Sequence, residues 1–119
     1  MTEQGETGLK LPPVHQLGYV VSDIEKTCRY YESTFGMGPF SEVIDVDMDG
    51  AFLRGKPVKT KIKVAFAQSG DVQVEFIQPV EGENVYTEFL ASKGDGIHHL
   101  AFQVDDMDAI KAEFAKKGF

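Results

Sequence analysis

The sequence predicts a single α+β domain of two related units, the first with the order βαβββ and the second ending after its helix. Residues 16–23 and 99–106 share one pattern, in which a short strand leads into an acidic turn and a helix. Between these copies, residues 61–67 and 72–77 alternate in the manner of strands with two different faces. Two similar units predict a pseudo-symmetric domain whose equivalent faces meet at its middle.

The first unit begins with a strand over residues 14–21 and a helix that follows it. Ser22 and Glu25 have the spacing of a capping box, in which each side chain satisfies a backbone N–H of the first turn. Apolar side chains recur at steps of four, three and four along the helix, so they share one buried face. Gly36 and Pro39 end the helix. The residues of the buried face are Ile24, Cys28, Tyr31 and Phe35.

Three more strands complete the first unit. Residues 40–46 form the next strand, and residues 47–57 form a turn-rich, mobile connection. Strands over residues 61–67 and 72–77 are joined by a hairpin turn at residues 69–71. Alternation in the last strand separates Val72, Val74 and Phe76 from Gln73, Glu75 and Ile77.

A short helix over residues 85–93 leads to the second unit, whose strand carries two adjacent histidines. On a regular strand His98 and His99 lie on opposite faces. The apolar, core-facing side is made of His98, Leu100, Phe102 and Val104. A helix over residues 107–117 follows, with Met107, Ile110 and Phe114 turned inward. The repeat then lacks three strands, which indicates a truncated chain or an edge that another chain completes.

Composition limits the classes of function. A net charge of −7 and a pI near 4.8 argue against a protein that binds nucleic acid or an anionic membrane. A single cysteine allows no intrachain disulfide and favours the cytoplasm, and the sequence shows neither a signal peptide nor an apolar run long enough to span a bilayer.

Residues 1–13 are predicted to be a flexible lead. The domain comprises a first unit over 14–80, a linker helix and turn over 81–96, and the start of a second unit over 97–119.

Two stretches resemble the vicinal oxygen chelate superfamily, which includes glyoxalases, bleomycin resistance proteins and dioxygenases. They are EFIQP at residues 75–79 and KGDGIHHLAFQVDD at residues 93–106. The double histidine between glycines and Asp-Asp is most similar to the methylmalonyl-CoA epimerase and glyoxalase I branch. The resemblance implies paired βαβββ units that form an incomplete barrel around one divalent metal ion. It also implies an enzyme that removes a proton next to a carbonyl, with the metal stabilising the enediolate.

Carried over position by position, the metal ligands of that branch fall on Gln16, Glu75 and His99, and a fourth glutamate would lie beyond Phe119. Gln16 and His99 are equivalent in the repeat, so they should face one centre. Such a set of nitrogen and oxygen donors suits Zn, Ni, Co, Mn or Fe. By the same resemblance, a metal-bound carboxylate, Glu75 or the fourth glutamate, is the catalytic base.

Other interpretations of these residues stay open. His15 replaces Gln16 if the strand register shifts by one, although that shift turns Leu17 to the wrong face. Glyoxalase I enzymes can have glutamine at the position equivalent to Gln16, whereas epimerases of this superfamily usually have histidine there. Without a metal, His99 is a hydrogen-bonded strand histidine and Glu75 a solvated carboxylate. His98 is expected to face away from the metal, on the helix side or at the surface.

A run of five bases without an acid stands out in an acidic chain. Its members are Arg54, Lys56, Lys59, Lys61 and Lys63. Local positive potential attracts anions, so Arg54, Lys56 and Lys59 are candidates to bind the phosphates of coenzyme A or a substrate carboxylate. A solvated strand and loop is the simpler explanation of the same run.

The sequence therefore predicts a cytoplasmic, metal-dependent isomerase or lyase that acts on a small acyl thioester or hemithioacetal and forms a homodimer. Two alternatives belong to the same superfamily. One is a binding protein of the drug-resistance type, without catalysis. The other is an extradiol-type dioxygenase, which needs two histidines and a carboxylate on iron and would therefore need His15 as a ligand.

Overall fold

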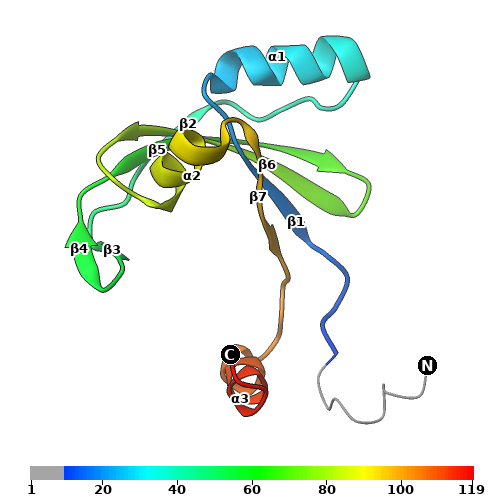
Figure 1. Ribbon diagram of the computed structural model, residues 1–119. Helices are drawn as coiled ribbons and strands as arrows, with labels where there is room; N and C mark the ends of the chain where they lie inside the picture. The colour runs from blue at the N-terminus through cyan, green and yellow to red at the C-terminus, as the bar shows by residue number, and fades with distance from the viewer. Residues whose placement is uncertain (1–9) are drawn as a thin grey trace.

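A computed structural model describes residues 10–119 and shows one mixed sheet, a separate hairpin and three helices (Figure 1). The elements in order are β1 (Gln16–Val20), α1 (Ile24–Phe35), β2 (Ile44–Asp47), β3 (Ala51–Leu53), β4 (Lys56–Val58), β5 (Lys61–Ser69), β6 (Val72–Glu81), α2 (Val85–Lys93), β7 (Gly96–Ala101) and α3 (Met107–Lys116). The lead predicted for residues 1–13 lies mostly outside the described residues. None of the helices within residues 10–119 is long and apolar enough to cross a membrane.

The main sheet has the strand order β2-β5-β6-β1-β7. β1 is parallel to β6, and the other neighbouring strands are antiparallel. The two strands of the sequence repeat, β1 and β7, are therefore direct neighbours, as a pseudo-symmetric pair would be. Within the described residues the sheet does not close into a barrel. The predicted α+β class is confirmed, with a βαβββ unit followed by the strand and helix of a second one.

Two apolar clusters lie on opposite faces of the sheet. Beneath α1, Ile24 packs with Ala65 and Phe76, and these three side chains are at most 1% exposed. On the other face, Val64 and Ile77 form a second cluster with side chains that include Tyr86 of α2. The alternation predicted for β5 and β6 is thus confirmed. It places Glu75 on the same face as Ile77, away from α1.

The start of α1 differs from the prediction by one residue. The Asp23 carboxylate, not the Ser22 hydroxyl, caps the helix and accepts a hydrogen bond from the Lys26 N–H at 3.1 Å. The Val21 N–H still donates to the Ile77 carbonyl at 2.9 Å, so the chain stays extended beyond β1 and the helix begins later. The Ser22 hydroxyl donates to Asp95 instead, at 3.3 Å. The predicted Ser22–Glu25 capping box is therefore wrong.

Three further expectations about the first unit are corrected. Residues 47–57 are not an irregular connection, because β3 and β4 form a hairpin with Arg54 and Gly55 at positive φ in its turn. Residues 40–43 precede the strand, and the Phe40 ring stacks on Phe76 with centroids 4.7 Å apart. Phe35 is 60% exposed, because its ring packs against tyrosines of its own helix rather than against the sheet.

The second unit is more exposed than predicted. Leu100 is 51% exposed and Met107 is 60% exposed. No residue of α3 is buried, so its apolar side chains are not turned into a core. Figure 1 shows α3 apart from the sheet, beyond the end of β7. β7 is an edge strand of the main sheet within the described residues.

Candidate metal site

Glu75 and His99 converge on Gly18 from the two strands beside β1. Gly18 is paired with Glu75 on β6 and with His99 on β7. The Glu75 Oε1 and His99 Nε2 atoms are 3.8 Å apart, and the two side chains are 15% and 29% exposed. A Cβ atom at position 18 would overlap the His99 ring, so the absent side chain of Gly18 provides the space for the imidazole.

Burial changes the acid–base properties of this pair. It raises the pKa of the Glu75 carboxyl above its usual range. The pKa of His99 is lowered, first by burial and then by the neighbouring His98. Both shifts favour the neutral forms, so the pair is not a strong ion pair in isolation. A cation between them would instead favour a carboxylate and a neutral imidazole, which are the forms that bind metals.

The two adjacent histidines lie together, contrary to the prediction of opposite faces. Gly18 pairs with His99 and Tyr19 with Ile97, which leaves His98 as the extra residue of a β-bulge. The bulge interrupts the alternation of the strand. The Nδ1 atoms of His98 and His99 are consequently 2.9 Å apart, within hydrogen-bond distance.

Sequence reasoning missed two aromatic residues of α2 that border this pair. The Tyr86 ring lies 5.1 Å from that of His98 and 6.4 Å from that of His99, and the Phe89 ring lies 5.0 Å from that of His98. Burial and the charge of Glu75 raise the pKa of the Tyr86 hydroxyl. The available signal was their spacing, because residues three apart share one face of a helix.

A buried polar cluster fixes the start of α2. Asn84 is 5% exposed and caps the helix by accepting a hydrogen bond from the Thr87 N–H at 2.8 Å. Its amide donates to the Thr60 hydroxyl, which donates in turn to the Glu81 carbonyl at 2.8 Å. The helix that carries Tyr86 is thereby attached to the end of the sheet.

Gln16 lies beside the pair rather than in contact with it. It is two residues from Gly18 on β1, so its side chain is on the same face. Its amide donates to the Gln73 side chain at 2.7 Å. His15 is exposed, and strand alternation directs it to the opposite face from Gln16. The structure thus brings Glu75 and His99 together and leaves Gln16 nearby on that face.

The bases of the predicted run differ in their partners, because Arg54 and Lys61 have acidic neighbours. Arg54 makes a two-pronged ion pair with Glu88 of α2, with N–O distances of 2.7 and 2.8 Å. Within residues 10–119, neither Lys56 nor Lys59 takes part in an ion pair, and both are exposed. The Arg54 contact ties the β3–β4 hairpin to the helix that borders the site. The binding of substrate by these three bases stays a prediction.

The donor atoms present fit part of a metal coordination shell. Glu75 offers a carboxylate oxygen and His99 an imidazole nitrogen, and the Gln16 carbonyl lies on the same face. Nitrogen and oxygen donors of this kind suit divalent first-row metals. Within residues 10–119, no group of three or more histidine, cysteine or acidic side chains converges on one point. The described residues therefore supply two strong metal donors, Glu75 and His99, whose donor atoms are 3.8 Å apart.

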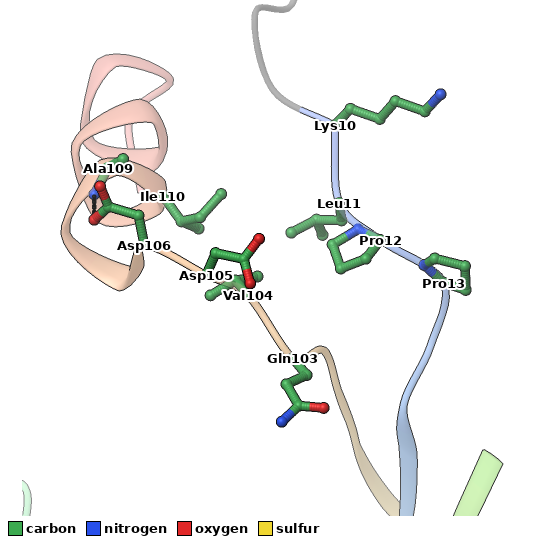
Figure 2. Close-up of a pocket in the computed structure, with 10 residues that line it drawn as sticks. All are labelled: Lys10, Leu11, Pro12, Pro13, Gln103, Val104, Asp105, Asp106, Ala109 and Ile110. Atoms are coloured by element: carbon green, nitrogen blue, oxygen red, sulfur yellow. Dashed lines mark hydrogen bonds between the residues drawn. The ribbon is translucent and has the colours of Figure 1, made fainter. Parts of the chain in front are cut away.

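A hollow of about 450 Å³ lies elsewhere, between residues 10–13 and the segment that enters α3 (Figure 2). Its walls include Leu11, Val104 and Ile110, and Asp106 lies at one side. The Asp106 carboxylate is already engaged, because it accepts a hydrogen bond from the Ala109 N–H at 3.0 Å as the cap of α3. None of the predicted site residues lines this hollow.

The fold agrees with the family to which the chain belongs. Residues 15–119 match the Glyoxalase/Bleomycin resistance protein/Dioxygenase superfamily, and the chain is a member of that superfamily. The predicted superfamily is thus confirmed.

Two curated relatives are of particular interest. Mitochondrial methylmalonyl-CoA epimerase of Mus musculus is 27% identical over 109 residues, which are 91% of this chain and 54% of the relative. The uncharacterized protein YqjC of Bacillus subtilis is 33% identical over 87 residues, which are 72% of this chain and 53% of the relative. The chain spans about half the length of these two relatives.

Solved structures show the same fold. Methylmalonyl-CoA epimerase from Mycobacterium tuberculosis aligns with a TM-score of 0.62 and 19% identity, over 91% of this chain and 65% of that one. A variant of the Streptomyces coelicolor epimerase, in complex with 2-nitronate-propionyl-CoA, aligns with a TM-score of 0.60 and 22% identity. That match covers 92% of this chain and 74% of the other. At these identities the likeness establishes the fold alone.

Proposed function

We propose that this chain is part of an epimerase-like enzyme that binds one divalent metal ion and moves a proton at the carbon next to a thioester carbonyl. The observation that carries the proposal is the convergence of Glu75 and His99 on the space left by Gly18. Sequence similarity to methylmalonyl-CoA epimerases supports the reaction class. An acyl thioester is the preferred substrate class, and a hemithioacetal is the alternative.

Each of the candidate ligands has a distinct part. His99 supplies its Nε2 atom and Glu75 a carboxylate oxygen. Gln16 supplies its carbonyl oxygen if its amide turns away from Gln73. When bound, a divalent ion supplies positive charge beside the substrate carbonyl oxygen and so lowers the cost of negative charge there.

Glu75 is the proposed base. Its carboxylate has two oxygens and lies 3.8 Å from His99 on a largely buried face, so one oxygen can hold the metal while the other accepts a proton from the substrate. The proton passes from the carbon next to the carbonyl to a Glu75 oxygen, and inversion then requires a second acid that delivers a proton to the opposite face of that carbon. Tyr86 keeps its own proton at neutral pH, because burial and Glu75 raise its pKa. Its ring helps to keep water away from the exchange.

Lys56 and Lys59 are proposed to meet the anionic part of the substrate. Both are exposed, and they lie on or just after β4, the second strand of the hairpin that Arg54 fastens to α2. Coenzyme A phosphates would be attracted by these charges without close shape recognition.

Metal binding by the purified chain tests the site. Competition with a chelating dye should show close to one equivalent of zinc or cobalt in the parent. Glu75→Ala and His99→Ala should each lower the affinity at least about 10-fold, because each removes a donor. Glu81→Gln is the matched control on the same strand, where the Lys61 pair is long and exposed. A parent that binds no metal, or variants that bind as well as the parent, would refute the proposed site.

Deuterium exchange tests the reaction. The metal-loaded protein is incubated with methylmalonyl-CoA in heavy water, and mass spectrometry follows incorporation at the carbon between the two carbonyls. We expect incorporation that Glu75→Ala abolishes and that Glu81→Gln leaves intact. Tight binding of small molecules that chelators do not affect, without any exchange, would instead identify a binding protein of the same superfamily.

A further inference from the structure

We propose that His98 is a positioning residue, which accepts a hydrogen bond from the Nδ1–H of His99 and thereby keeps the His99 Nε2 atom unprotonated and directed at Glu75. The inference deepens the proposed function and rests on it, because it concerns His99 as a metal ligand. Nothing in the sequence pattern distinguishes this role, since regular alternation would place the two rings on opposite faces of β7.

The β-bulge at His98 makes the contact possible. His98 has no partner on β1, whereas its neighbours Ile97 and His99 are paired with Tyr19 and Gly18. The extra residue brings the imidazole of His98 to the side of the sheet where His99 lies. The ring centroids are 5.2 Å apart, and the two Nδ1 atoms are 2.9 Å apart.

A hydrogen bond between two neutral imidazoles contains one proton, so one Nδ1 atom donates and the other accepts. The Nε2 atom of His99 lies 3.8 Å from Glu75, too far for a direct hydrogen bond but close enough for an ion to lie between them. A metal requires the lone pair of that Nε2 atom, which places the ring proton of His99 on Nδ1. His98 must then be the acceptor, with its own proton on Nε2.

Aromatic side chains hold His98 in this orientation. Tyr86 and Phe89 meet its ring edge to face, with centroid distances of 5.1 and 5.0 Å. Both belong to α2, whose start is tied to the sheet through Asn84 and Thr60. The partner of a metal-ligating histidine fixes the ring orientation and the tautomer, and its loss typically weakens metal binding about 10- to 100-fold.

The hydrogen bond can be tested without metal. Long-range ¹⁵N–¹H NMR at about pH 8.5, two units above the ordinary histidine pKa, reports which nitrogen of each ring carries the proton. In the parent we expect His99 with its proton on Nδ1 and His98 with its proton on Nε2. His98→Phe keeps an aromatic ring between Tyr86 and Phe89 but removes the acceptor, so His99 should move its proton to Nε2. His98→Asn places a carbonyl oxygen near the former Nδ1 position and should restore the parent pattern.

Zinc affinity, measured by chelator competition, tests the consequence. His98→Phe should bind zinc about 10-fold more weakly than the parent, and His98→Asn should recover most of that loss. Ile97→Ala, at the exposed neighbouring position, is the control for disturbance of β7. A proton on the His99 Nε2 atom in the parent, or an unchanged tautomer in His98→Phe, would overturn the inference. Equal zinc affinity of His98→Phe and the parent would overturn it too. If the parent binds no zinc, the proposed function fails, while the NMR result still decides whether His98 orients His99.

Discussion

Gly18 is the residue on which the geometry of the site depends. It is buried, its φ lies outside the left-handed region, and a Cβ there would overlap the His99 ring. Position 18 is therefore limited to glycine by the space that the His99 ring occupies, not by a backbone conformation that only glycine adopts. The sequence repeat pairs this glycine with Ala101, a residue with a Cβ, so the repeat alone did not reveal the need for a glycine.

Gly18→Ala should displace the His99 imidazole and lower metal affinity about 10-fold or more, because the ring can no longer lie against β1. The fold should persist, since His99 is partly exposed and its side chain can rotate. Gly96→Ala is the matched control, because a Cβ there meets the Phe89 ring at 3.9 Å, an ordinary contact. Chelator competition on both variants measures the effect. Parent-like affinity in Gly18→Ala would show that the ring does not need this space.

Cys28 is a core residue rather than a nucleophile. It is 8% exposed in the cluster beneath α1. Burial, together with the negative charges of Glu32 and Glu25, raises the pKa of its thiol to about 11. The thiolate is the reactive form, so this cysteine is protonated and unreactive at neutral pH.

At the scale of helices and strands, local sequence patterns predicted which segments form regular structure, but not the residue at which each helix begins. The α2 boundaries follow from its pattern and from Gly94. The start of α1 does not, because Ser22 and Asp23 are both good caps in sequence. The tertiary hydrogen bond of Val21 to Ile77 decides between them by keeping the chain extended for one more residue.

The two candidate caps give a direct stability test. Asp23→Ala should lower the free energy of unfolding by about 1 kcal/mol, because the Lys26 N–H loses its acceptor. Ser22→Ala, the control one residue earlier, should change it by no more than about 0.5 kcal/mol, since its bond to Asp95 is exposed. Urea denaturation of both variants measures the difference. The reverse order of the two losses would favour the capping box at Ser22.

The position of each site residue in its strand or helix also determined whether the sequence could predict it. Glu75 and His99 follow from strand alternation together with the family resemblance, and the structure places them side by side. The β-bulge that brings His98 to His99 is not visible in the sequence, because a bulge arises from pairing with another strand. Tyr86 and Phe89 joined the site only through the docking of α2.

At the scale of the whole molecule, the two units of the repeat are unequal in burial. The first unit contains both apolar clusters, on opposite faces of its sheet. The second contributes β7 at the sheet edge and α3, which has no buried residue. Periodicity alone predicted an inward face for α3, because a pattern reports which residues can be buried and not whether a partner surface is present. The homodimer and the cytoplasmic location remain predictions.

Hydrogen exchange of the 119-residue chain tests whether α3 is less protected than the buried helix α1. Amide protons of α3 should show protection of no more than about 10-fold, because a short helix without tertiary contacts is marginal in water. Those of α1, a helix of similar length that buries Ile24 and Cys28, should be protected far more strongly. Mass spectrometry after digestion separates the two segments. Equal protection of both helices would show that α3 is docked in solution.

The family resemblance selected Glu75 and His99, and the sequence by itself determined the α+β class, the repeat, and the faces of β5 and β6. These features depend on the spacing of side chains along one segment, which the chain carries wherever it is placed. The tertiary structure alone decided the space above Gly18, the contact of His98 with His99, the pairing of Arg54 with Glu88 and the exposure of α3. Each of these depends on atoms from segments distant in sequence, whose approach is set by packing and register rather than by local pattern.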